Sequence, residues 1–523
     1  MRTGQAEVIA FLSDPASYGC DGGVDRFETH ANLVFLAASD AWKIKRAVRF
    51  PYLDFSTLEK RHAACVREVE VNRRFAPDIY LGCVPITRSS SRDALEFGGS
   101  GEVVEWAVHM RRFEQSAILS NLATTAGITP ELARRVADVV FESHRQADRA
   151  ALEHGAAAID DIVTSLSRSL AQSHRFNADH VRTFSREAQG QLGRARTTLD
   201  DRAARGYVRR CHGDLHLANI VLWQGHPVLY DAIEFDESIA TTDTLYDLAF
   251  LLMDLDRHSQ RRAANEVLNR YLWRSNDDLD LGGLIALPLL LGVRAGVRAV
   301  VSADRAAQEQ GKASQSDQER AHAYLQAAIG YLTPPPPQLI AVGGLSGTGK
   351  TTLAAALAPR IGSAPGAVHV RSDLERKSLF GAQETMRLGA ASYLPKVSQE
   401  VYEALRRKAC IALEAGHSVV VDAVYSRPQE RHDIEAIAGA VGVPFRGLWL
   451  QAEPEKLMSR VTARRNDASD ATASVVQQQL GADIGPFSAA WTAIDANGSL
   501  EVVLHTASLI LGSGGQFDRV SRS

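Results

Sequence analysis

The chain has 523 residues, too many for one hydrophobic core, so two or three domains are expected. Hydrophobic residues make up 45% and charged residues 23%, as in ordinary water-soluble proteins, and the formal net charge is -4. A chain without an excess of basic residues has no overall electrostatic attraction to the phosphates of a nucleic acid. This argues against nucleic acid as the main partner. Five scattered cysteines without a C-x-x-C pair favour a reducing compartment over a disulfide framework or a zinc site.

Neither the N-terminus nor the longest apolar stretch has the pattern of a membrane or export segment. Glu7 and Asp14 interrupt the first apolar run, and no basic segment precedes it. Residues 281–301 are the most apolar, but one proline and two arginines interrupt them. We therefore expect a buried helix there, no membrane partner and a cytoplasmic location.

The first part of the chain combines short strand-like runs with one charged helix. Residues 33–36 and 42–45 have strand character, and residues 58–75 have helical spacing. The last two residues of the run 42–45, Ile and Lys, match the end of the V-A-I-K pattern of kinases. The lysine of that pattern contacts nucleotide phosphates and pairs with a glutamate on a helix. This comparison selects Lys45, with Lys43 as the alternative on the same face of the strand.

The helix over 58–75 should supply the glutamate that pairs with this lysine. Glu68 is the expected residue, and Glu70 is the alternative. An Ala-rich helical region follows over about 130–205.

The next segment, His212 to Asn219, contains a carboxylate and an amide five residues apart. This D-x-x-x-x-N spacing is typical of a kinase catalytic loop. Asp214 would orient or accept the proton of an attacking hydroxyl, and Asn219 would hold a metal ion that bridges the phosphates. His212 and His216 are expected to be structural, fixing the loop by hydrogen bonds.

Two short strand-like runs, 220–223 and 228–231, flank a turn at 224–227 and predict a hairpin. Asp231 closes the second run and is the expected second metal ligand, as the Asp of a D-F-G segment would be. The Phe-Gly part is missing, and Glu234 is the runner-up ligand. Residues 245 to about 329 are again helical, so a small β-rich lobe precedes a large helical lobe.

The region from about 25 to 325 resembles the aminoglycoside phosphotransferase-like kinases. The matching residues are the run 212–216 with Asn219, then Asp231, then Asp247, which is structural in that family. The resemblance implies an α+β protein-kinase-like fold that phosphorylates hydroxyls of small molecules. The chain departs from the family pattern because no G-x-G-x-x-G motif, which would cover the phosphates, precedes Lys45. The alternative interpretation is a degenerate kinase that is retained as a scaffold.

Four consecutive prolines at 334–337 predict an extended spacer, because proline cannot continue a helix or a central strand. We therefore expect a kinase-like domain over 1–330, a linker over 331–338, a second domain over 339–510 and a tail over 511–523.

The second domain should be an α/β fold with a parallel sheet, because strand-like runs alternate with helices. The expected strands are residues 339–342, 367–370, 418–422, 446–450 and 500–504. The run 344–351 satisfies every fixed position of the Walker A pattern between a strand and a helix. Its glycines and helix N-terminus would bind phosphates, and its lysine and threonine would reach the β/γ oxygens and Mg²⁺. The expected binding residues are Gly344, Ser346, Gly347, Thr348, Gly349, Lys350, Thr351 and Thr352.

Three further residues complete the predicted second site. Asp373 follows a strand and would act as a base, with a helix N-cap as the alternative role. Asp422 ends the next strand as a Walker B-like aspartate that would order Mg²⁺. Arg464, in a basic run over 460–465, would belong to a lid that closes over the phosphate, or else to a solvated helix face.

Residues 338–505 resemble small P-loop kinases of the gluconate kinase and zeta-toxin type, and the whole chain resembles fusions of both domains. The resemblance implies an ATP- and Mg²⁺-dependent phosphotransferase with two nucleotide sites and small-molecule hydroxyl substrates. A regulatory or stress-associated protein that uses ATP as a switch is the alternative.

Overall fold

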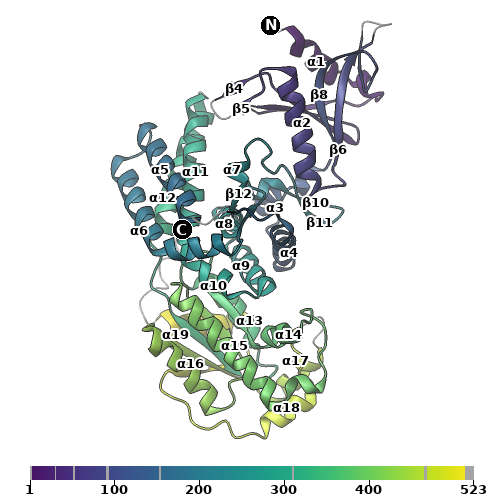
Figure 1. Ribbon diagram of the computed structural model, residues 1–523. Helices are drawn as coiled ribbons and strands as arrows, with labels where there is room; N and C mark the ends of the chain where they lie inside the picture. Colours follow the sequence, from purple (N-terminus) through teal and green to yellow (C-terminus); the bar gives the residue numbers. More distant parts are fainter. Residues whose placement is uncertain are drawn as a thin grey trace. The chain divides into compact units, whose positions relative to one another are not determined.

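The computed structural model describes residues 3–29, 31–50, 53–89, 94–151, 155–308, 311–463 and 468–512. The chain forms two compact units, and each unit contains two separate segments of the sequence (Figure 1). Unit 1 contains Met1–Ala150 and Gly206–Asp254, and unit 2 contains Ala151–Arg205 and Leu255–Ser523. The domain boundary expected at 331–338 falls between a helix and a strand of unit 2, and it stays a prediction.

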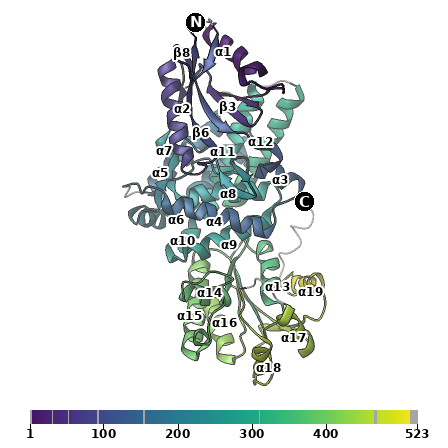
Figure 2. The ribbon, with the colours of Figure 1, turned by 90° about the vertical axis from the view of Figure 1, so that its right-hand side faces the viewer.

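Unit 1 begins with a six-stranded antiparallel sheet in the order β1-β2-β3-β8-β6-β7. Helix α1 packs on one face through Val8 and Leu12, and α2 packs on the other through Cys65 and Val69 (Figure 2). The strand alternation in β2 and β3 supplies apolar side chains to both layers. The bounds are α1 Thr3–Ser13, β1 Asp25–Glu28, β2 Asn32–Ala37, β3 Asp40–Lys45, β4 Arg49–Phe50, β5 Leu53–Asp54, α2 Leu58–Arg73, β6 Tyr80–Arg88, β7 Leu95–Phe97 and β8 Glu102–Arg111.

The rest of unit 1 is mainly helical and includes the predicted hairpin, β10 paired with β11. Its turn is only Gln224 and Gly225, with φ of 49° and 78°, which is the tight turn that matches the twist of antiparallel strands. His226 and Pro227, expected in the turn, instead begin β11. The bounds are α3 Leu119–Thr125, α4 Pro130–Gln146, β9 Val208–Arg210, β10 Ile220–Trp223, β11 His226–Leu229, α7 Glu237–Ala240, β12 Thr241–Asp243 and α8 Thr244–Arg257.

In the described part of the chain, unit 2 contains six α-helices before the proline run. They are α5 Gly155–Gln172, α6 Ala178–Ala204, α9 Arg261–Ser275, α10 Asp278–Gly282, α11 Leu287–Gln308 and α12 Gly311–Leu332. The stretch Asp278–Ala307 is long and apolar enough to cross a membrane, but 72% of its most apolar window is buried inside the protein. This burial confirms the predicted buried helix. A core helix of a globular protein can be as apolar as a membrane span.

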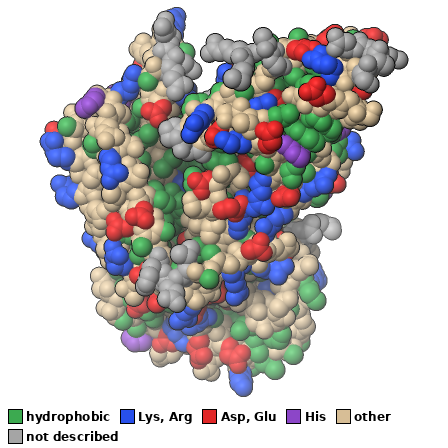
Figure 3. Space-filling model, turned by 45° about the horizontal axis from the view of Figure 1, so that its top comes forward, with side chains coloured by type: hydrophobic (Ala, Val, Ile, Leu, Met, Phe, Trp, Pro, Cys, Tyr) green, Lys and Arg blue, Asp and Glu red, His purple; other side chains and the backbone are tan. Residues whose placement is uncertain are grey.

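Acidic and basic side chains are interspersed over the face of the molecule shown in Figure 3. This distribution fits the small net charge of -4. Mixed signs prevent the long-range single-sign field that would steer a polyanion to this face.

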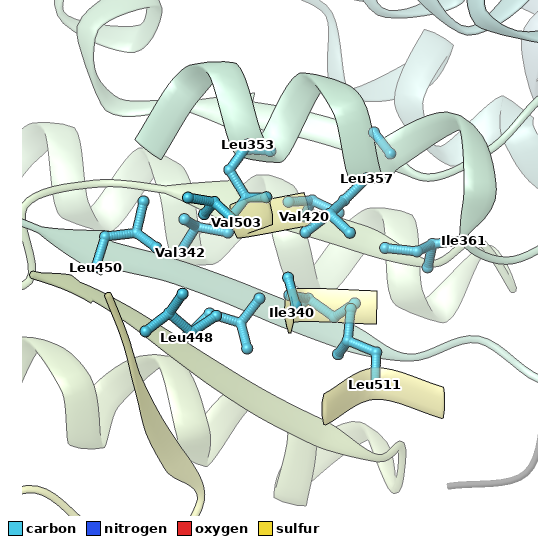
Figure 4. Close-up of a cluster of buried hydrophobic side chains, with 14 of the residues drawn as sticks. Ile340, Val342, Leu353, Leu357, Ile361, Val420, Leu448, Leu450, Val503 and Leu511 are labelled. Atoms are coloured by element: carbon cyan, nitrogen blue, oxygen red, sulfur yellow. The ribbon is translucent and has the colours of Figure 1, made fainter. Parts of the chain in front are cut away.

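The proline run leads from α12 into a five-stranded parallel sheet in the order β14-β15-β13-β16-β17. Helices α13 and α19 cover one face, where Ile340, Val342, Leu353 and Val503 form a fully apolar layer (Figure 4). Helices α15 and α16 lie on the other side (Figure 2). The bounds are β13 Leu339–Gly344, α13 Lys350–Leu357, β14 Val368–Arg371, α14 Ser372–Leu379, α15 Pro395–Glu414, β15 Val419–Asp422, α16 Pro428–Val441, β16 Phe445–Gln451, α17 Pro454–Ala463, α18 Ala473–Leu480, β17 Trp491–Asp495 and α19 Leu500–Gly512.

The two-part fold class predicted from sequence is confirmed, and four of the five expected strands of the second sheet are present. The strand predicted at 500–504 is wrong, because these residues begin helix α19. Val503, Ala507 and Leu511 are buried and recur every four residues, which is the helical period. The fifth strand is instead β17, whose Trp491 is buried and pairs in register with Gly447.

Candidate active sites

In unit 1, one buried glutamate holds both candidate lysines. Lys43 and Lys45 lie on the same face of β3, since strand side chains alternate. Glu68 on α2 lies 2.8 Å from Lys43 Nζ and 2.6 Å from Lys45 Nζ. Burial alone would raise the pKa of Glu68, but the two ammonium groups lower it to about 2, so the carboxylate stays charged. Glu70, the alternative, is exposed and pairs with Arg67.

The two lysines differ in their second partner. Lys45 Nζ lies 2.5 Å from Glu234, and the two side chains are 1% and 9% exposed. Lys43 Nζ lies 2.7 Å from Asp231, whose side chain is 46% exposed. Lys43 is therefore at the open end of the network and Lys45 at its closed end, so the ammonium group of Lys43 is the better placed to meet a ligand.

The segment 212–219 forms a compact loop around Asp214. The amide of Asn219 donates hydrogen bonds to the Asp214 carbonyl at 2.9 Å and to Asp214 Oδ2 at 3.0 Å. His216 Nε2 lies 3.3 Å from the same carboxylate oxygen. Because the amide nitrogen of Asn219 is engaged, its amide oxygen is the atom that can ligate a cation.

Helix α8 holds this loop at both ends with two buried carboxylates. Asp247 accepts hydrogen bonds from the backbone N–H of His212 at 3.3 Å and of Gly213 at 2.8 Å. Asp254, two helical turns later, accepts one from the N–H of Leu217 at 2.9 Å. Each bond satisfies a buried backbone donor that would otherwise be costly. The Asp254 contact was missed from sequence, because no local pattern marks a carboxylate whose partner lies 37 residues away.

The β10–β11 hairpin brings the two predicted metal ligands together. Asn219 and Tyr230 flank its strands, and the N–H of Tyr230 donates to the carbonyl of Asn219 at 3.0 Å. Asp231 follows with φ of 58°, an uncommon conformation for a residue other than glycine, and its N–H donates to Tyr80 Oη at 3.2 Å. An amide oxygen and a carboxylate are suitable hard ligands for Mg²⁺.

The β1–β2 turn lies before the lysine strand and contains no glycine. Gly19, Gly22 and Gly23 all precede β1. The small lobe therefore lacks, at this turn, the glycine backbone that would let N–H groups approach phosphates closely.

In unit 2, three glycines of the Walker A run have conformations that other residues rarely adopt. The φ values are 139° at Gly344, 89° at Gly347 and 92° at Gly349. A Cβ at Gly344 would lie 2.6 Å from a backbone oxygen, and one at Gly347 would lie 2.7 Å from another. Gly349 precedes α13, which begins at Lys350. This geometry leaves the helix N-terminus open to an anion.

Other side chains of the run are held within unit 2. Lys350 Nζ donates to the carbonyl of Leu345 at 3.0 Å, and Thr348 Oγ1 donates to the same carbonyl at 2.8 Å. The N–H of Ser346 donates to Gln479 at 2.8 Å. Thr352 is exposed in the first turn of α13.

The carboxyl ends of β13, β14 and β15 bring further site residues together. Asp422 pairs in register with Val342 and Arg371. Its Oδ1 accepts a hydrogen bond from Thr351 Oγ1 at 3.2 Å, and its Oδ2 lies 2.7 Å from His369 Nε2. A hydroxyl beside a carboxylate is a donor set that fits Mg²⁺. His369 was missed because a single histidine on a strand carries no pattern.

Asp422 and Asp373 have pKa values pushed in opposite directions. Burial would raise the pKa of Asp422, but the hydrogen bond and charge of His369, with Arg371 and Lys350, lower it. Burial and the nearby Asp422 raise the pKa of Asp373, against the attraction of Lys350 and Arg371. Asp373 is the second residue of α14, and Arg371 occupies the N-cap position.

The predicted lid residue Arg464 lies outside the described residues. Its neighbour Arg460 is described and donates to the carbonyl of Ala496 at 2.9 Å and of Gly347 at 3.5 Å. The end of α17 therefore touches the Walker A run.

Residues 339–482 match the family model described as "AAA domain". Over 463 residues the chain is 29% identical to an uncharacterised protein of Mycobacterium tuberculosis (strain ATCC 25618 / H37Rv), covering 86% of this chain and 88% of that one.

Similar solved structures fall into two groups. A choline/ethanolamine kinase family protein from Mesorhizobium loti is 16% identical, with a TM-score of 0.38, over 62% of this chain and 95% of its own. An aminoglycoside 2'-phosphotransferase-IIIa is 11% identical, with a TM-score of 0.38, over 61% and 99%. A sugar kinase from Janibacter sp. HTCC2649 is 20% identical, with a TM-score of 0.26, over 34% and 95%. Structures of both expected kinase types are thus among the similar proteins, and the family match at 339–482 includes the Walker A run.

Proposed function

We propose that the chain is an ATP-dependent phosphotransferase with two nucleotide sites. Each site transfers the γ-phosphoryl group to a hydroxyl of a small molecule. The observation that carries this proposal is that each unit assembles a complete set of phosphate- and cation-handling groups. Each set has a lysine, two oxygen ligands for Mg²⁺ and a carboxylate that is proposed to act as a base.

In unit 1, Asp214 is the proposed base for the attacking hydroxyl. Asn219 and Asp231 would hold Mg²⁺, which neutralises charge on the phosphates. The lysine pair on β3 and Glu68 would position the nucleotide. Lys43 is favoured for direct phosphate contact because its second carboxylate partner, Asp231, is half-exposed, whereas Glu234, the second partner of Lys45, is only 9% exposed.

In unit 2, the Walker A backbone and Lys350 would bind the β- and γ-phosphates, and Thr351 with Asp422 would hold Mg²⁺. Asp373 is the proposed base. The opposite pKa shifts of the two aspartates favour this division of roles, because the more basic carboxylate is the better proton acceptor. Arg464 is proposed to stabilise the transferred phosphoryl group from a lid.

A cytoplasmic location and the absence of a nucleic-acid or membrane partner belong to the same proposal. The interspersed surface charges and the burial of the longest apolar helical stretch support them.

A regulatory nucleotide-binding protein is the second candidate. Two observations favour it in unit 1. The β1–β2 turn lacks glycine, and Lys43 already forms ion pairs with Asp231 and Glu68. A site of this kind could bind ATP as a conformational signal with slow hydrolysis.

The deciding experiment incubates the purified protein with labelled ATP, Mg²⁺ and a library of hydroxyl-bearing metabolites. Asp214→Ala and Lys350→Ala are compared with the unaltered chain. The proposal expects at least one labelled product that depends on Asp214 and one that depends on Lys350. If both variants match the unaltered chain in ATP consumption and in products, the proposal fails. Binding without turnover favours the regulatory candidate.

A further inference from the structure

Helix α9 precedes the proline run but lies along the free edge of the second sheet. Asn265 donates to the carbonyl of Ala367 at 3.0 Å, and Asn269 accepts from the N–H of His369 at 2.7 Å. These two asparagines, one turn apart on α9, satisfy outward backbone groups of the edge strand β14. An edge strand whose backbone groups are already hydrogen-bonded cannot pair with a further strand. The same hydrogen bonds hold the backbone of the edge strand in place.

The same helix continues to the carboxyl end of β14, where the proposed chemistry takes place. Arg270 lies 2.8 Å from Glu384, and Glu384 lies 3.3 Å from Arg371, the last residue of the strand. Arg270 also stacks on Trp273, with its guanidinium carbon 4.5 Å from the ring centroid. The carboxylate of Glu384 therefore forms ion pairs with two arginines, Arg270 from α9 and Arg371 from the P-loop site.

Two more contacts link this end of α9 to α14, the helix that carries Asp373. Trp273 Nε1 donates to the carbonyl of Leu374 at 3.3 Å. Lys408 binds Asn276 at 2.8 Å and Glu375 at 2.7 Å. Leu374, next to the proposed base, is thus held directly by a residue before the proline run, and Glu375 is linked to Asn276 through Lys408.

Arg371 has capacity to bind a further group. Its Nε is buried, and no described residue accepts a hydrogen bond from it. A buried guanidinium N–H without an acceptor is costly, and an anionic oxygen is its best partner. Arg371 pairs in register with Asp422 at the carboxyl ends of β14 and β15, which places it among the site residues.

We propose that α9 positions a nucleotide-binding residue of the P-loop site. In this arrangement Arg270 holds Glu384, Glu384 orients Arg371, and the guanidinium of Arg371, whose side chain is 18% exposed, donates to an oxygen of the nucleotide's terminal phosphate. Arg270 is a positioning residue, because it acts through Glu384. The inference rests on the proposed nucleotide site of unit 2, and it explains why residues far outside the stretch 339–482 belong to that site.

A double-mutant cycle tests the relay in the full-length chain. Arg270→Ala, Arg371→Ala and the double variant are made with Asp214→Ala, so that turnover reports on unit 2. Nucleotide binding to unit 2 is taken as the part that an added Lys350→Ala substitution removes. The affinities for ADP and for the non-hydrolysable analogue AMP-PNP are measured with Mg²⁺. We expect Arg371→Ala to weaken AMP-PNP binding by about 10- to 100-fold, the value of a charge-assisted hydrogen bond, with ADP binding nearly unchanged.

The effect of Arg270→Ala should depend on Arg371. Alone it should weaken AMP-PNP binding about 3- to 10-fold, and in the Arg371→Ala background it should have no further effect. Arg270→Lys should restore part of the loss. Arg262→Ala, an exposed arginine on the same helix, is the matched control and should change neither affinity. Thermal unfolding of each variant shows whether it folds.

The outcomes separate this inference from the function on which it rests. If no nucleotide binds in a Lys350-dependent manner, the proposed site itself fails. If both nucleotides bind but Arg270→Ala weakens ADP and AMP-PNP equally, or acts by the same factor with and without Arg371, the relay is wrong while the site stands.

Discussion

The two candidate sites hold charge in different ways. In unit 1, side chains from β3, α2 and the segment after β11 form one ion-pair network centred on Glu68. In unit 2, a continuous loop of backbone, shaped by three glycines with positive φ, opens onto a helix N-terminus. A network of side chains can satisfy itself without a ligand, whereas a concave loop of N–H groups is built for an anion.

This difference has a consequence for how each site would bind a nucleotide. In unit 1, Lys43 would have to exchange its contact with Asp231 for a phosphate oxygen if Asp231 held Mg²⁺ as proposed. In unit 2, the glycine conformations already exist, so less rearrangement is needed. We therefore expect unit 2 to bind nucleotide more tightly.

The largest expected effect is the loss of turnover when a proposed catalytic group of either site is replaced. Asp214→Asn should lower the turnover of unit 1 by about 10²- to 10⁴-fold, because it removes the proposed base. Lys350→Ala should lower that of unit 2 by about 10²- to 10³-fold through lost charge stabilisation. ATP consumption by each variant, and by the double variant, checks this. If the double variant retains the activity of either single variant, a third source of turnover exists and the two-site comparison fails.

The next effect contrasts the two lysines of unit 1. Lys45→Met leaves Glu234 buried without its cation, and should lower the free energy of unfolding by about 3–5 kcal/mol. Lys43→Met should cost only about 1 kcal/mol, because Asp231 is half-exposed and Glu68 keeps Lys45. It should instead weaken nucleotide binding to unit 1. Urea unfolding and nucleotide titration of both variants measure this, and a reversed pattern would assign phosphate contact to Lys45.

A smaller effect concerns pH and is specific to unit 2. His417 is buried just before β15, and burial lowers its pKa to about 4 from 6.5. The unfolded chain therefore binds more protons between pH 6.5 and 4, so stability is fully present above this window and falls as pH drops through it. The loss should reach about 3 kcal/mol, at about 1.4 kcal/mol per pKa unit. His417→Leu should flatten this part of the stability–pH curve, and an unchanged curve would refute the assignment.

The smallest effect concerns the edge of the second sheet. Asn269→Ala leaves the N–H of His369 without its 2.7 Å acceptor and should lower the free energy of unfolding by about 1–2 kcal/mol. Arg262→Ala, on the same helix and exposed, should change it by less than about 0.5 kcal/mol. Hydrogen exchange at β14 should rise in the first variant alone. Equal exchange in both would mean that α9 does not support this strand.

Local patterns predicted much of this molecule. The Walker A run was recognisable because its lysine, threonine and glycines are contiguous and their spacing follows from backbone geometry alone. The loop with Asp214 and Asn219 and the hairpin that follows it were recognisable for the same reason. The strand at 500–504 was mispredicted because two adjacent valines favour a strand locally, while the open face of the sheet required a helix.

The sequence by itself determined the two fold types, the two motifs proposed to bind phosphate and the residues next to them in the chain. Only the tertiary structure decided that Glu68 binds both lysines, that Asp254 supports the Asp214 loop, and that α9 reaches across to Glu384. The reason is physical. Backbone conformation and periodicity are properties of neighbours in sequence, whereas ion pairs and edge contacts depend on which distant surfaces meet during packing.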